Sequence, residues 1–182
     1  MAASMPGGLV GEKGAPRGRA FRRAPEAWDT HSMSVRAALD AVLQEDQVAY
    51  EVDEARGLLR VPGLAPEGDW LLLAQWSEND DELVAYAVCT LAVPAPRRAA
   101  VMEFITRANF GLKVGCFELD LDDGELRFRA SVDFEGATVQ PAQVRGALFT
   151  GVATLRAYLP GLADVVEGAD VKATLAAIEA RR

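Results

Sequence analysis

The chain has 182 residues, of which half are hydrophobic and a quarter are charged, a composition typical of one folded domain. Its net charge of −8 is uneven, because residues 1–32 hold five Lys or Arg against three acidic residues, whereas residues 33–182 hold fourteen against twenty-four. The acidic body is not expected to bind duplex nucleic acid directly, and no apolar stretch approaches the roughly 18–20 residues that a membrane span needs.

Residues 1–32 are rich in Gly, Pro, Ala and Arg and show no apolar period, which predicts a mobile basic tail. Its arginines either form a small basic arm or belong to a solvated tail without a partner; they are Arg17, Arg19, Arg22 and Arg23. Met33 precedes the first periodic segment and is therefore also a candidate translation start. We expect residues 33–182 to form a single cytoplasmic domain with a C-terminal helical extension.

A helix is predicted from Ser34, a candidate N-terminal cap, to about residues 45–47. Short strands at 48–52 and 58–61 follow, and longer strands at 70–76 and 83–93 come next. Pro94 and Pro96 end the last of these and open a second helix. The apolar stripe of this helix consists of Val101, Phe104, Ile105, Ala108 and Leu112.

A hairpin with the turn Asp122-Asp123-Gly124 follows the second helix, because Asp and Gly tolerate the backbone angles of tight turns. A long helix then runs from Pro141 towards Tyr158, and Pro160-Gly161 is expected to kink or end it. The last helical segment, 162–180, is expected to divide near Gly168. This order predicts an α+β fold, with an antiparallel β-sheet flanked by helices.

The strands differ in the chemistry of their two faces. Residues 125–134 alternate strictly between apolar and polar side chains, which predicts that one face of the strand is exposed to solvent. In the preceding strand, Phe117, Leu119 and Leu121 are expected to point inward. Strands 70–76 and 83–93 are apolar on both faces. Helices can bury one face of the sheet, so the other face would expose a large apolar surface unless something else covers it. A partner protein or a second copy would provide this cover, unless the terminal helices or the N-terminal tail do. The candidate interface residues are Trp70, Leu72, Trp76, Val84, Tyr86 and Val88.

The sequence offers no catalytic, cofactor-binding or metal-binding constellation. The one histidine, His31, lies at the tail boundary, and Cys89 and Cys116 lie in apolar strands where a free thiol is expected. Zinc would need three or four converging Cys or His ligands. The acids of residues 120–125 resemble the start of a calcium loop, but Gly124 occupies the fifth position, so a turn is predicted. An enzyme that uses carboxylates alone remains the catalytic alternative.

The segment from Arg107 to Arg129 resembles the signature region of the bacterial YbjN family. The positions that carry the resemblance, which extends over about residues 34–160, are Asn109, Phe110, Gly115, Phe117, Asp123, Gly124 and Arg129. That family is similar in fold to type III secretion chaperones. The resemblance implies an α-β-β-β-α-β-β-α core and a non-enzymatic, chaperone-like or adaptor protein. It also implies a homodimer that needs no cofactor and binds a segment of a partner protein.

A second hypothesis assigns the chain to nucleic-acid metabolism. In this reading it is an accessory protein that acts through a protein partner, with residues 1–32 as a basic arm.

Overall fold

The computed structural model describes residues 33–62, 70–77 and 81–181, so the predicted tail lies outside the described residues. The first half contains α1 (Val35–Glu45), β1 (Glu51–Asp53), β2 (Leu58–Pro62), β3 (Trp70–Ser77) and β4 (Glu82–Cys89). The second half contains α2 (Arg98–Gly111), β5 (Cys116–Leu119), β6 (Leu126–Asp133), α3 (Pro141–Glu167) and α4 (Val171–Glu179). A short 3-10 turn at Glu54–Arg56 follows β1, and a second one at Ala95–Arg97 precedes α2.

The described strands form one six-stranded sheet in the order β1-β2-β3-β4-β6-β5, and every neighbouring pair is antiparallel. This confirms the predicted α+β class. Four strands precede α2 rather than the three of the resemblance, because the chain turns back at Glu54–Arg56 and pairs β1 with β2.

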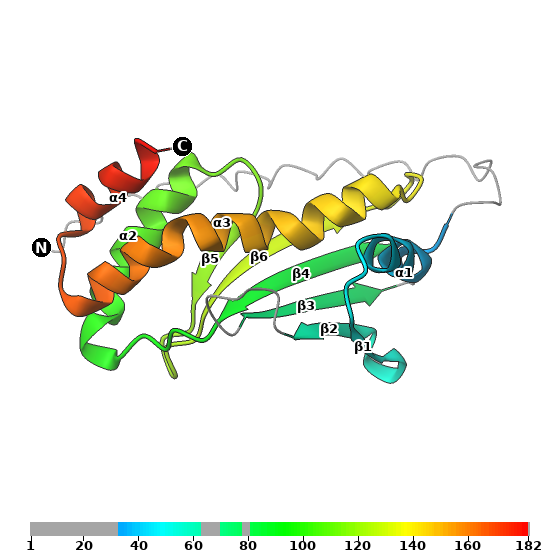
Figure 1. The fold of residues 1–182 in the computed structure, drawn as a ribbon, viewed down its shortest axis with the longest axis horizontal. Helices are drawn as coiled ribbons and strands as arrows, with labels where there is room; N and C mark the ends of the chain where they lie inside the picture. The colour runs from blue at the N-terminus through cyan, green and yellow to red at the C-terminus, as the bar shows by residue number, and fades with distance from the viewer. Residues whose placement is uncertain (1–32, 63–69, 78–80, 182) are drawn as a thin grey trace, which may run out of the picture.

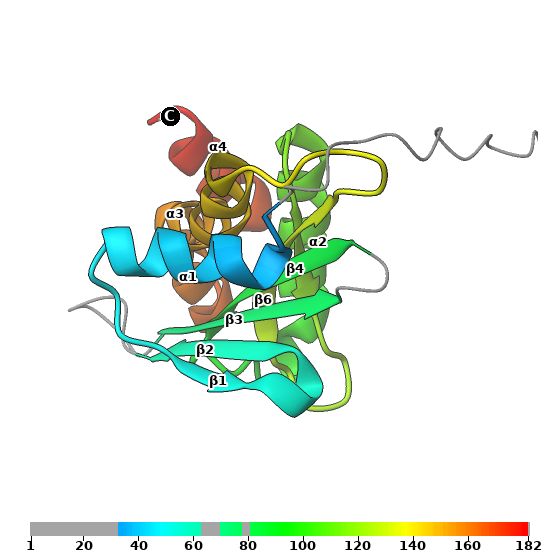
Figure 2. The ribbon, with the colours of Figure 1, turned by 90° about the vertical axis from the view of Figure 1, so that its right-hand side faces the viewer.

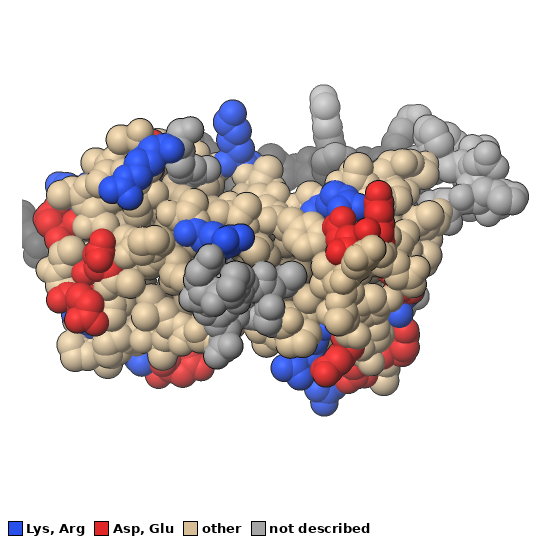
Figure 3. Space-filling model, viewed as in Figure 1, with Lys and Arg blue, Asp and Glu red and all other residues tan. Residues whose placement is uncertain are grey.

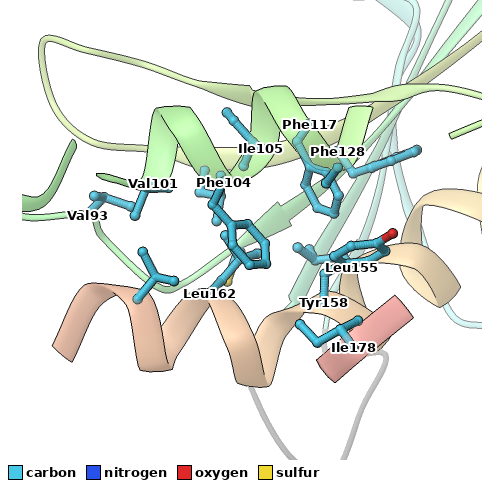
Figure 4. Close-up of a cluster of buried hydrophobic side chains, with 14 of the residues drawn as sticks. Val93, Val101, Phe104, Ile105, Phe117, Phe128, Leu155, Tyr158, Leu162 and Ile178 are labelled. Carbon is cyan, nitrogen blue, oxygen red and sulfur yellow. The ribbon is translucent and has the colours of Figure 1, made fainter. Parts of the chain in front are cut away.

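The helices lie together over one face of the sheet, with α3 along its length, α1 at one end and α2 and α4 at the other (Figures 1 and 2). Two apolar clusters fill the space beneath them. The cluster at the α1 end draws on α1, β2, β3, β4 and the first half of α3. The other cluster is built from α2, α4, β5, β6 and the second half of α3, as the close-up in Figure 4 shows.

Aromatic side chains form the centre of the cluster around α2. The ring of Phe117 lies edge-on to those of Phe128 and Tyr158, with centroid distances of 5.1 and 5.4 Å. Phe104 reaches Tyr158 from α2 in the same edge-on manner, at 6.3 Å (Figure 4). Edge-to-face pairs add roughly 0.5–1.5 kcal/mol beyond the burial of their surface. This contact network fixes α2 and α3 against the β5–β6 hairpin.

Local signals in the sequence set several element ends. The Ser34 hydroxyl accepts a hydrogen bond from the N–H of Ala37 at 3.1 Å, which confirms the predicted cap of α1. Gly124 has a φ of +87° in the predicted turn, and an added Cβ would lie 2.2 Å from the carbonyl oxygen of Val93. Glycine is therefore required there both by the backbone angle and by the close approach of the connection between β4 and α2, where Val93 lies.

Two predictions about local structure differ from the structure. Pro160-Gly161 does not end the helix, because Leu162 and Val165 are fully buried and this packing outweighs the missing N–H, so α3 continues through Pro160 to Glu167. The predicted division of the last segment near Gly168 is confirmed, since α3 ends there and Gly168 has a φ of +115°. Leu121 is 55% exposed rather than inward, because β5 ends at Leu119.

Candidate functional site: the open face of the sheet

One face of the sheet is left without helices in the described part of the chain. Strand pairing places Leu71 opposite Val88, and Leu73 opposite Tyr86, on this face. We call its central apolar surface the open face; its residues are Leu71, Leu73, Val84, Tyr86 and Val88. All five are only partly buried, and none belongs to either core cluster. Their partial burial thus comes from the strands themselves and not from a helix layer.

A charged group borders the open face on β5 and β6. Arg127 donates to one carboxylate oxygen of Glu118 at 2.8 Å, and Arg129 donates to the other at 2.6 Å. The guanidinium of Arg127 also lies over the ring of Tyr86, 4.6 Å from its centroid. Arg127 also lies 3.6 Å from a carboxylate oxygen of Glu125, so this margin is a group of paired charges, two arginines with two glutamates, packed beside Tyr86.

The ionisation of this group follows from its neighbours. Partial burial opposes the charged form of Glu118, but its hydrogen bonds with Arg127 and Arg129 and the charge of both outweigh that effect and lower its pKa. The Glu118 hydrogen bond is the largest contribution that raises the pKa of Arg129. The group therefore stays ionised over the physiological pH range.

The opposite margin of the open face lies on β1 and β2. Strand pairing aligns Glu51 with Arg60, and Arg60 with Leu73. Charged residues therefore lie beside the apolar centre on this side as well. A hollow of about 480 Å³ lies here; its lining includes Glu51, Asp53, Leu58, Arg60, Leu71 and Leu73. The open face is thus an apolar strip about two strands wide with charged residues on both sides, an arrangement found in protein-binding surfaces.

The structure places the sequence-predicted interface residues on two different faces. Val84, Tyr86 and Val88 lie on the open face, whereas Leu72 and Trp76 are 1% and 8% exposed and pack in the core beneath α1. The side chain of Trp70 lies outside the described part of the chain.

Strand register explains why the predicted set had to be revised. Leu83 is opposite Trp76, and Val84 is opposite Gln75, so the apolar sets chosen on β3 and β4 point in opposite directions. Leu71 and Leu73 are the β3 residues that share the face of Tyr86. Their apolar alternation is visible in the sequence, but their alignment with β4 is not.

Helix α2 carries a second exposed apolar surface that the sequence reading missed. Met102 and Phe110 point away from the core and are 45% and 97% exposed. The signal was present, because Ala99, Met102, Thr106 and Phe110 recur at spacings of three and four opposite the buried stripe.

The described residues contain no group of three or more His, Cys, Asp or Glu side chains placed to hold a metal ion. Cys89 and Cys116 are both free, as predicted, and burial raises the pKa of the Cys89 thiol. No helix within the described ranges is long and apolar enough to span a membrane. On the side shown in Figure 3, Asp and Glu gather towards the two ends of the molecule.

The chain was compared with known proteins. The family model YbjN, described as a putative bacterial sensory transduction regulator, matches residues 36–164. The crystal structure of YbjN, a putative transcription regulator from E. coli, is similar at 10% identity with a TM-score of 0.48, covering 70% of this chain and 94% of that one. The HopA1–SchA chaperone–effector complex contains a chain similar at 14% identity with a TM-score of 0.39, covering 73% of this chain and 90% of that one. No curated protein matches. Because the family model spans more than half of the sequence, the chain belongs to the YbjN family.

Proposed function

We propose that the protein is a cytoplasmic, non-enzymatic adaptor or chaperone-like module that binds a segment of a partner protein on the open face. The observation that carries this proposal is the apolar strip centred on Leu73 and Tyr86, which no described helix covers. Exposed apolar surfaces bordered by polar residues mark interaction sites in soluble proteins.

The chemistry of the open face indicates what such a segment contains. Apolar side chains would pack on Leu71, Leu73 and Val88, and an acidic side chain beside them would meet Arg127 or Arg129 at the margin.

The proposal is tested by placing a charge in the apolar strip. Tyr86→Glu and Leu73→Glu should each weaken binding of the co-purifying partner by about 10-fold or more, since residues at the centre of an interface dominate its energy. Isothermal titration with the purified partner measures the change. Leu121→Glu is the matched control, because Leu121 is 55% exposed in the β5–β6 turn, away from the strip. Unchanged affinity in folded Tyr86→Glu and Leu73→Glu proteins would contradict the proposal.

We also propose that the protein acts as a homodimer. The support is the second exposed apolar surface on α2, which carries Met102 and Phe110 and belongs to a different element from the open face. A dimer formed there leaves each open face available, so one assembly presents two binding surfaces. Sedimentation equilibrium should give twice the chain mass, and a monomer at all concentrations would contradict the homodimer.

A further inference from the structure

A hollow of about 640 Å³ lies between the α2–β5 connection, the middle of α3 and the end of α4. No described residue lines both this hollow and the open face, so the two are separate places on the molecule. Sites for small molecules are commonly concave spaces of about 300–1,000 Å³ at the junction of several elements. The size and position of the hollow therefore suit a small molecule.

Hydroxyl groups form one wall of the hollow. Thr150, Thr154 and Tyr158 follow one another at a spacing of four residues on α3, which places them on one side of the helix, and all three line the hollow. Thr154 is only 9% exposed, and no described residue forms a hydrogen bond with its side chain. A buried hydroxyl without a protein partner is unfavourable. Its hydrogen-bonding capacity is thus left for a molecule in the hollow.

Two opposite charges stand at the same hollow without pairing. Lys113 comes from the α2–β5 connection and Glu179 from the last residue of α4, and both are exposed. Within the part of the chain that the structure describes, neither forms an ion pair. A molecule with a single charge would be attracted by one of these groups and repelled by the other. A zwitterion would satisfy both.

The remaining wall is apolar. Leu112 and Val114 flank Lys113 on the α2–β5 connection and line the hollow with it. Val114 is 53% exposed, although valine is usually found inside proteins. An apolar group of a bound molecule would cover this side chain. The hollow thus combines a row of hydroxyls, two unpaired charges and an apolar wall.

We propose that the hollow binds a free α-amino acid with an apolar side chain, a small-molecule site in addition to the protein-binding open face. The ammonium of Lys113 binds its carboxylate, and the carboxylate of Glu179 binds its ammonium. The hydroxyls of Thr150 and Thr154 donate to the bound carboxylate, and the apolar side chain packs on Val114.

Isothermal titration of the full chain with leucine, valine, methionine and phenylalanine tests the site. At least one should bind saturably and raise the unfolding temperature. Its amide lacks the carboxylate and its N-acetyl derivative lacks the ammonium, so each should bind about 10-fold or more weakly. Absence of binding by any of these amino acids would overturn the proposal, as would inorganic phosphate that binds as tightly as the amino acid.

Two substitutions assign the charges. Lys113→Gln should bind the amino acid and its amide with equal affinity, and Glu179→Gln should do the same for the amino acid and its N-acetyl derivative, because the group that distinguishes them is gone. Lys172→Gln and Glu167→Gln are the matched controls, since neither residue lines the hollow, and both should bind as the wild type does. Discrimination that survives in Lys113→Gln and Glu179→Gln would overturn the assignment.

Thr154→Val tests the buried hydroxyl. It should weaken binding of the amino acid, whereas the unfolding temperature of the ligand-free protein should stay the same or rise, because no described hydrogen bond is lost. A lower unfolding temperature with unchanged binding would show that this hydroxyl serves the fold, and would overturn its role in the site.

Discussion

Asn109 connects the last turn of α2 to the edge of the sheet. Its amide group donates to the carbonyl of Phe117 at 3.1 Å, and its amide oxygen accepts from the N–H of Phe117 at 2.8 Å. Among the described strands β5 pairs only with β6, so these two bonds satisfy backbone groups that an edge strand would otherwise leave open. Asn109 thus has a structural role, which is to hold β5 and satisfy its edge.

Replacing Asn109 by leucine should lower the free energy of unfolding by about 1–3 kcal/mol, because both bonds are lost and the backbone of Phe117 is left unpaired. Urea denaturation followed by circular dichroism measures the change. Asn109→Asp retains the acceptor for the N–H of Phe117, so its free energy of unfolding should fall by less. Wild-type stability in Asn109→Leu would show that the contact does not support β5.

Glu118 should make stability depend on acid pH. Its pKa is lower in the folded chain than in the unfolded chain, so its ionised form stabilises the fold above its ordinary pKa, and this contribution is lost as the pH falls through the lowered value. The stability difference between wild type and Glu118→Gln should be constant near neutral pH and shrink below about pH 4.3. A difference that grows on acidification would contradict the assigned ion pairs.

The strands define which side chains belong to the core. Leu72 is buried under α1, whereas its neighbour Leu73 lies on the open face. We predict that Leu72→Ala costs about 2–5 kcal/mol of stability and that Leu73→Ala costs about 1 kcal/mol or less. Chemical denaturation of the two variants measures the difference. Equal losses would mean that the open face is covered in the free protein.

Pro160 provides a test of α3. Pro160 lies inside the helix and has no backbone N–H to donate, unlike the other residues of a helix interior. Pro160→Ala should raise the free energy of unfolding by about 1–3 kcal/mol, since proline is the least favourable residue inside a helix. Thermal unfolding checks this. A lower stability of Pro160→Ala would indicate that the ring makes contacts worth more than the restored bond.

The elements show what one sequence can and cannot specify. The cap at Ser34, the buried stripe of α2 and the turn at Gly124 follow from local chemistry and were predictable. The course of α3 beyond Pro160 was not predictable, because it depends on packing against residues that are distant in the sequence. Alternation assigned side chains to the two faces of each strand, but only the register between β3 and β4 shows that Tyr86 accompanies Leu73 and not Trp76.

At the scale of the whole molecule, the fold separates two tasks. The helices and one face of the sheet enclose both apolar clusters and account for stability. The open face and the outer side of α2 are the two surfaces that we propose for contacts with other molecules, and they lie on different elements. In the proposed assembly each copy uses α2 for its twin and the open face for a partner segment, so either surface can be changed without the other.

Hydroxyl-radical footprinting of the protein alone and in complex with its co-purified partner tests the central claim most directly. The account predicts that Leu71, Leu73 and Tyr86 become protected in the complex, while the exposed Leu121 and Val114 are labelled equally in both samples. Unchanged labelling of the open face in a complex that protects other residues would contradict it.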